Sequence, residues 1–177
     1  MINFIYYTAL IYRMNVKEVL IAVNNKDEII NFILRSNAHK NQVLHRAIGV
    51  IIKKDNKIFV QKRSQNKDVF PGFYEASLSG HVSKDETYKT TALRELKEEL
   101  GLNIKESKLV FLGKKLIKTK KDNHFMTFYL LKISKQKIKI DNKEVAKGMF
   151  VSKTELLQSI KKNKFTPWNI EGLKLIN

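Results

Sequence analysis

The segment Gly80–Leu102 constrains the fold of this chain more than any other part of its sequence. Between Glu86 and Leu100 it contains neither glycine nor proline, so it predicts a helix that begins at Glu86. Ser83 and Glu86 have the spacing of a capping box. Gly101 stands where a left-handed C-terminal cap is favoured. The segment therefore predicts a loop, a capped helix and a glycine stop.

The predicted helix has an apolar face and an acidic face. Leucines share the first (Leu93, Leu96 and Leu100), and glutamates share nearly the opposite one (Glu95, Glu98 and Glu99). Clustered carboxylates repel one another unless a cation lies among them. Oxygen ligands suit a hard divalent ion, so we expect the three glutamates to bind Mg²⁺, with Mn²⁺ as a substitute. Arg94, four residues before Glu98, is expected to pair with that carboxylate and orient it.

Glutamate-rich helix faces are often only solvated surface. Here the glutamates stand in register with Gly80, Glu86, Arg94 and Gly101, and every fixed position of the pattern G-x5-E-x7-R-E-U-x-E-E-x-G-U is matched, where U is apolar. The segment therefore resembles a complete Nudix box. The resemblance implies a magnesium-dependent hydrolase of a diphosphate linkage and a Nudix-type α/β/α sandwich around a mixed β-sheet.

Composition excludes several other classes of protein. The chain has 177 residues, enough for one domain with a sizeable core. It has no cysteine, which excludes disulfides and thiolate chemistry and is typical of a reducing, cytoplasmic protein. No apolar run is long enough for a transmembrane helix, so we expect no membrane partner. The oligomeric state stays open, a homodimer included.

The formal net charge of +17 raises the question of nucleic acid. Only five of the 34 basic residues are arginines, the lysines spread along the whole chain, and aromatic residues do not alternate with them as in a nucleic-acid platform. The charge therefore does not indicate a nucleic-acid partner. It does provide a field that would attract a small anionic diphosphate.

We expect a single domain at residues 14–177, preceded by an apolar, aromatic extension at residues 1–13. The extension lacks the features of a signal peptide, so we expect an additional strand or an upstream start codon. Strands are expected at 18–23, 28–34, 46–53, 57–62, 109–117, 124–133 and 148–151, a loop at 64–73, and a capped helix from 152 to about 161. Such a mixture predicts an α/β fold with helices on the faces of a sheet.

Outside the box, short segments resemble the type I isopentenyl-diphosphate isomerase branch of the same superfamily. They are Ala38-His39, Leu44–Ala47, Gln61–Ser64, Lys67, Phe70–Gly72, Ser79–His81 and Phe165–Trp168, and the likeness covers about residues 16–168. The resemblance implies diphosphate contacts at Arg35, Arg63 and Lys67. It also implies metal-binding histidines at His39, His45 and His81, although the first two stand one residue closer together than in that branch. Gly80, His81 and Trp168 complete the expected substrate-binding set.

Simpler roles remain open for some of these residues. The position of His45, just before an apolar strand, is also typical of a histidine that only forms structural hydrogen bonds. His81 could simply cap the loop. Trp168, the sole tryptophan, fits either the core or a substrate lid. Arg63 and Lys67 could be solvated, but a diphosphate needs cationic partners.

Three departures separate the chain from the isomerases. Ser79 stands where that branch needs a cysteine, and a serine is a far weaker acid toward carbon. His124 stands where that branch keeps an acidic residue, with Asp122 two residues earlier. All three box glutamates are present, whereas the isomerases retain only the last. We therefore expect a hydrolase, with an isomerase and a non-catalytic or RNA-associated Nudix module as alternatives.

The sequence leaves two regions that could supply the general base for the attacking water. Glu99 is the candidate inside the box, and Asp122 and Glu144 are the acids best placed on later loops. Glu144 ends a polar turn before an apolar strand and could reach over the box helix, or the turn could be only a solvated hairpin tip. We expect Glu98, Glu99, Arg94 and Glu144 to form the catalytic set.

Overall fold

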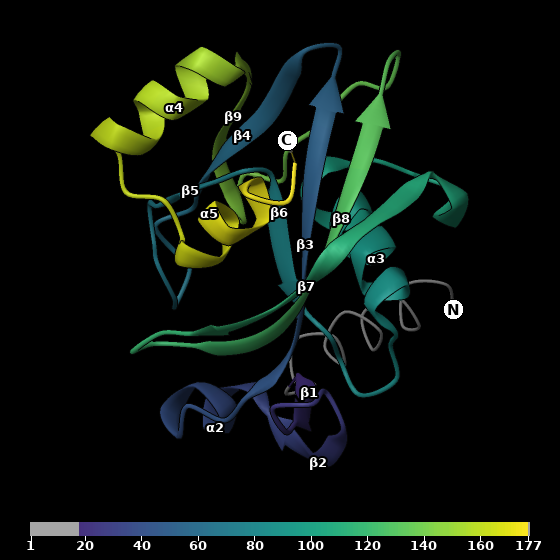
Figure 1. The fold of residues 1–177 in the computed structure, drawn as a ribbon, viewed down its shortest axis with the longest axis vertical. Helices are drawn as coiled ribbons and strands as arrows, with labels where there is room; N and C mark the ends of the chain where they lie inside the picture. Colours follow the sequence, from purple (N-terminus) through teal and green to yellow (C-terminus); the bar gives the residue numbers. More distant parts are fainter. Residues whose placement is uncertain (1–17, 177) are drawn as a thin grey trace, which may run out of the picture.

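The N-terminal part of the fold is a small hairpin with one short helix. The computed structural model describes residues 18–176, so the expected extension at residues 1–13 lies outside the described part. Strands β1 (Val19–Val23) and β2 (Ile29–Leu34) pair antiparallel, and helix α2 (Arg35–Lys40) follows directly. These three elements lie together at one end of the molecule (Figure 1).

Strand β3 (His45–Lys54) is the central strand of a nine-stranded mixed sheet. It pairs in parallel with β8 (Asn123–Ile133) over its full length, and antiparallel with β1, β4 and β6. The remaining strands extend the sheet to both sides: β4 (Lys57–Arg63), β5 (Tyr74–Glu75), β6 (Leu78–His81), β7 (Leu109–Lys118) and β9 (Val145–Ser152). A short 3-10 turn, η1 (Glu106–Lys108), precedes β7.

Alternation along β3 divides the core into two layers. Ile48, Val50 and Ile52 point to one face and pack with the leucines of α3 (Tyr88–Leu100). Ile51 points to the other face and packs with α4 (Lys153–Lys162) and α5 (Pro167–Leu173). Because successive strand residues face opposite sides, one buried strand can join two helical layers. The expected α/β/α sandwich around a mixed sheet is confirmed, and Figure 1 shows α3 apart from α4 and α5.

Helix α3 follows the predicted pattern except at its first turn. Leu96 and Leu100 are fully buried, and Gly101 ends the helix with a left-handed φ of 63°. The predicted start at Glu86 is wrong by two residues, and the capping box is formed by Thr87 and Thr90 instead of Ser83 and Glu86. The Glu86 carboxylate does accept a hydrogen bond from the Ser83 N–H at 3.3 Å, and it also binds Thr91 and Arg94. Because Thr87 is the N-cap, however, this bond lies in the loop before the helix.

Most other sequence predictions agree with the structure within one or two residues. The two N-terminal hairpins, β7, β8, the loop 64–73 and the capped helix α4 are confirmed. Strand β9 begins three residues earlier than predicted because it pairs with β4 along its whole length. Helix α2, β5, β6 and α5 were not predicted. The first three are too short for a periodic signal, whereas Thr166-Pro167 is a recognisable helix start.

Candidate functional site

The predicted site residues come together around one cavity of about 720 Å³ between α3, the loop 64–73 and the ends of β6 and β8. Its lining includes the box residues Gly80, Arg94, Glu95, Glu98 and Glu99, the cations Arg35, Arg63 and Lys67, and His81, Asp122, His124, Glu144 and Trp168. Of the substrate-binding, metal and catalytic residues proposed from the sequence, all but the histidines His39 and His45 border this cavity. The roles of these residues stay predictions.

Arg94 holds the acidic face of α3 together. Its Nε and Nη2 donate to the two carboxylate oxygens of Glu86, at 2.7 and 3.1 Å. Its Nη1 donates to Glu95 at 2.9 Å and to Glu98 at 3.0 Å. The predicted Arg94–Glu98 pair is thus confirmed, and it is one part of a larger network. Burial alone would lower the pKa of Arg94, but its bonds and ion pairs with Glu86 and Glu95 raise it, so the guanidinium stays charged.

The carboxylates of Glu95 and Glu99 fit an oxygen-ligand metal centre. Burial, followed by repulsion from Glu99, raises the pKa of Glu95 to about 8. Burial also raises the pKa of Glu99, against the attraction of Lys67. Two buried carboxylates that both resist ionisation have too little positive charge around them, and a divalent cation would supply it. Glu95, Glu98 and Glu99 would hold that ion.

Gly80 provides the space in which Glu95 lies. A Cβ at this position would stand 2.4 Å from Glu95 Oε1, which is well inside van der Waals contact. The sequence placed Gly80 among the substrate-binding residues. The structure gives the box glycine an additional role, because only a residue without a side chain lets the β6 backbone approach this carboxylate so closely.

Lys67 and Glu144 meet above the buried end of α3. Lys67 Nζ lies 3.4 Å from Glu99 Oε1 and forms an ion pair with Glu144. Burial would lower the pKa of Lys67, but Glu99 and Glu144 outweigh it and raise the pKa. Glu99 also accepts a hydrogen bond from Gln61 Nε2 at 3.0 Å. The side chain of Glu144 is 42% exposed and borders the cavity, so its turn is more than a hairpin tip.

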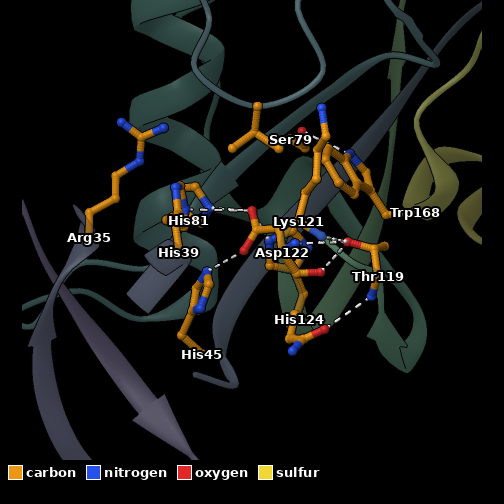
Figure 2. Close-up of polar contacts among 12 residues, drawn as sticks. Arg35, His39, His45, Ser79, His81, Thr119, Lys121, Asp122, His124 and Trp168 are labelled. Atoms are coloured by element: carbon orange, nitrogen blue, oxygen red, sulfur yellow. Dashed lines mark hydrogen bonds and ion pairs between the residues drawn. The ribbon is translucent and has the colours of Figure 1, made fainter. Parts of the chain in front are cut away.

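A second group of residues that could hold a metal ion surrounds Asp122, which borders the same cavity together with His81. Figure 2 shows His39, His45 and His81 pointing toward this carboxylate. Their ring nitrogens stand 3.4–3.6 Å from its oxygens, and one ligand atom from each of the four residues lies within 4.8 Å of the others. His124 Nε2 is 2.8 Å from Asp122. We call His39, His45, His81 and Asp122 the histidine centre.

The histidine centre also fits a metal ion. His39 Nε2, His45 Nε2 and Asp122 Oδ1 are buried and have no hydrogen-bond partner, which is costly without a ligand. Burial and the nearby His124 lower the pKa of His45 to about 4, so its imidazole is neutral at pH 7, as metal binding requires. Burial would raise the pKa of Asp122, but hydrogen bonds to His124 and His81 lower it instead. Three imidazoles and one carboxylate suit Zn²⁺ or Mn²⁺ better than Mg²⁺.

The sequence missed Glu75, a fully buried carboxylate behind the cavity. Glu75 accepts hydrogen bonds from Ser79 Oγ at 3.0 Å, from Trp168 Nε1 at 3.2 Å and from Arg63 Nη1 at 3.0 Å. The indole of Trp168 also donates to Ser79 Oγ at 3.1 Å. The signal available in the sequence was a lone acidic residue five positions before the box glycine Gly80. Trp168 is 3% exposed and lines the cavity, so the core and substrate-facing interpretations both apply.

The three cationic residues that are expected to bind the diphosphate differ in how their side chains are held. Arg63 is buried, with its terminal nitrogens bonded to Glu75 and to the carbonyl of Val69. Arg35 begins α2 at the rim and pairs with Asp68 at 2.7 Å and Glu18 at 3.4 Å. Among the residues that the structure describes, the ammonium group of Lys67 is held only by the carboxylates of Glu99 and Glu144. Arg35 and Lys67 can therefore turn toward an anion in the cavity more easily than Arg63.

Comparison with known proteins assigns the family. The model of the NUDIX domain matches residues 43–174, which includes the box and most of the sheet. The chain belongs to the Nudix family. Isopentenyl-diphosphate Delta-isomerase 1 of Photorhabdus laumondii is 31% identical over 85% of this Nudix chain and 90% of the relative. Nudix hydrolase 3 of Arabidopsis thaliana is 28% identical over 78% of the chain and 20% of the relative.

A solved structure supports the same Nudix fold. The crystal structure of DR0079 from Deinococcus radiodurans superimposes with a TM-score of 0.73, covering 90% of this chain and all of that one, at 21% sequence identity. Within the described residues, none of the helices of this Nudix protein is both long and apolar enough to cross a lipid bilayer.

Proposed function

We propose that this Nudix protein is a Mg²⁺-dependent hydrolase that cleaves the diphosphate linkage of a nucleoside diphosphate derivative or a related organic diphosphate. The observation that carries the proposal is the grouping of Glu95, Glu98 and Glu99 at one cavity that also holds Arg35 and Lys67. Acidic groups for a hard cation and basic groups for phosphate oxygens are the two requirements of diphosphate hydrolysis. The relative named Nudix hydrolase 3 supports the reaction class.

The side chains divide the work between binding and proton transfer. Arg94 fixes the orientation of Glu98 through a 3.0 Å bond, and Gln61 fixes Glu99. Arg35 and Lys67 neutralise the diphosphate and hold it in place. A divalent ion bound by the three glutamates supplies, when present, charge neutralisation of the substrate and activation of the attacking water. Glu99 or Glu144 accepts the proton of that water at a carboxylate oxygen.

The cytoplasmic location and the small-molecule partner belong to the same proposal. The cavity, at about 720 Å³, is of the size that takes one small organic ligand. The net charge of +17 supports attraction of an anionic substrate toward it. Mn²⁺ is the expected substitute for Mg²⁺ at the glutamates.

A second candidate is isomerisation of isopentenyl diphosphate. It is favoured by the relatives that carry the isomerase name and by the histidine centre, whose three histidines the resemblance to that branch implied. Ser79 opposes it. The Ser79 hydroxyl donates to Glu75 and accepts from Trp168, and a hydroxyl is a poor acid toward an allylic carbon.

One screen separates the candidates. The purified protein is incubated with Mg²⁺ and a panel of nucleoside diphosphate derivatives and prenyl diphosphates, and the hydrolysis products are separated and measured by chromatography. Hydrolysis of at least one compound that depends on Mg²⁺ is the expected result. Isopentenyl diphosphate is also analysed by mass-resolved chromatography, and no dimethylallyl diphosphate should form. Isomer formation above background would replace the hydrolase proposal by the isomerase, and no reaction with any compound would favour a non-catalytic module.

A further inference from the structure

The ammonium group of Lys67 lies between two carboxylates from different parts of the fold. Its Nζ is 3.4 Å from Glu99 Oε1 on α3 and forms an ion pair with Glu144 in the turn before β9. In the part of the chain that the structure describes, Lys67 is the sole cationic side chain within ion-pair distance of Glu99. Its charge therefore balances the most deeply buried carboxylate of the proposed Mg²⁺ centre.

Lys67 can leave this position without disturbing the core. It belongs to the loop 64–73, and its side chain is 20% exposed, whereas that of Glu99 is 4% exposed. Lysine carries its charge on a flexible four-carbon stem with freely rotating donors. Since Lys67 borders the cavity itself, a small rotation turns its ammonium group from the carboxylates toward an anion bound there.

We propose that Lys67 is a resident counter-ion that competes with the divalent ion for Glu99 and so couples metal binding to diphosphate binding, an inference that rests on the function proposed above. In the free protein, the ammonium group and a divalent ion repel each other across one carboxylate, which weakens metal binding. When a diphosphate enters the cavity, Lys67 turns to its oxygens and leaves Glu99 to the metal. Each ligand then strengthens the binding of the other.

The direction in which the metal affinity changes when Lys67 is replaced distinguishes this role from simpler ones. Charges about 4 Å apart near a protein surface interact strongly enough to change an affinity by about tenfold or more. A lysine that only bound the substrate would leave the affinity for the metal alone unchanged. A lysine that held the loop and the carboxylates in place would, when replaced, weaken metal binding. A counter-ion, when replaced, strengthens it.

The test measures Mn²⁺ binding to the purified full chain without substrate, from the electron paramagnetic resonance signal of the free ion. Binding that Glu98→Gln abolishes is assigned to the glutamates and not to the histidine centre. At that site Lys67→Met and Lys67→Gln should each bind Mn²⁺ about tenfold more tightly than the wild type. Lys143→Met is the matched control, because it removes an equal charge from an exposed side chain beside Glu144 and should change the affinity by less than about twofold.

A second titration repeats the measurement with inorganic pyrophosphate present. Pyrophosphate should strengthen Mn²⁺ binding to the wild type more than to Lys67→Met, since the variant has no ammonium group to transfer. Unchanged or weaker Mn²⁺ binding by both Lys67 variants overturns the inference, while the proposed function stands if Glu98→Gln still abolishes binding. If the wild type has no Glu98-dependent Mn²⁺ site, the proposed metal centre fails and the inference fails with it.

Discussion

Arg94 and Glu86 form a two-point ion pair, in which Nε and Nη2 of the guanidinium meet both carboxylate oxygens at 2.7 and 3.1 Å. The remaining terminal nitrogen, Nη1, is thereby directed at Glu95 and Glu98. The planar guanidinium has a fixed arrangement of donors, so its position on Glu86 determines where the other two carboxylates are held. Four fixed residues of the box thus act as one rigid unit at the edge of the cavity.

Glu98→Gln should lower Mg²⁺-dependent turnover by roughly 10²-fold or more, comparable to losing one strong transition-state interaction. The amide keeps the shape of the side chain but removes the charge that attracts the metal. Steady-state kinetics on the best substrate of the screen measures the effect. Glu106→Gln is the control, because Glu106 is also an exposed glutamate in an ion pair, with Lys89, and lies outside the cavity. Equal activity of the two variants would remove Glu98 from the metal centre.

Gly80→Ala should weaken Mn²⁺ binding and turnover together while leaving the melting temperature nearly unchanged. The new methyl group would stand 2.4 Å from Glu95 Oε1, so the carboxylate has to move away from Arg94 and from the other box glutamates. The side chain can move toward the cavity, so the core is not strained. Calorimetric melting and Mn²⁺ titration of the same sample check both parts. If this variant bound Mn²⁺ with the wild-type affinity, the position of the Glu95 carboxylate would not matter for metal binding.

The identity of the general base can be read from two pH–rate profiles. If the base is Glu99, Glu99→Gln abolishes turnover, and Glu144→Gln leaves the turnover and the profile as in the wild type. If the base is Glu144, Glu144→Gln removes the acidic limb of the profile. We expect Glu144→Gln to change the profile, because Glu144 is half-exposed at the cavity and can reach a bound water. An unchanged profile would assign the base to the box.

Asp27→Asn should destabilise the protein at neutral pH by about 2 kcal/mol, the range for hydrogen bonds to a charged group. The Asp27 carboxylate accepts from Arg46 at 2.7 Å and from Tyr88 at 2.8 Å, and it pairs with Lys114. These contacts join the β1–β2 turn to β3, α3 and β7. Urea unfolding of the wild type and the variant at pH 7 measures the difference.

The same pair of proteins tests the pH dependence. Burial would raise the pKa of Asp27, but bonds from Lys114 and Arg46 outweigh it and lower the pKa below its ordinary 3.8. A carboxyl group with a lowered pKa in the folded state stabilises the protein above its unfolded pKa and loses this effect as the pH falls. The gap between wild type and variant should therefore be full above about pH 5 and shrink below pH 4. Asp55→Asn, in an exposed turn with a similar positive φ of 53°, should show no such gap.

The sequence predicted those features that depend on neighbours along the chain. Helical spacing placed Glu95, Glu98 and Glu99 on one face of α3, and turn residues separated the strands correctly. Features that depend on register between distant strands were not predictable. Asp122 reaches the histidines because β8 pairs with β3, and Glu75 reaches Trp168 because α5 packs back on the sheet. The meeting of Lys67 with Glu144 likewise depends on the β4–β9 pairing.

The parallel pairing of β3 with β8 sets an order of assembly for the two metal-binding groups. His45 and His124 stand opposite each other in this pairing, and a long stretch of chain separates them. Closing so long a loop is entropically costly and slow, whereas a helix forms from adjacent residues. A chain emerging from the ribosome can therefore display the box glutamates on α3 while Asp122 and β8 are still to be synthesised. The histidine centre is complete only after that late strand has docked, so it cannot guide the first steps of folding.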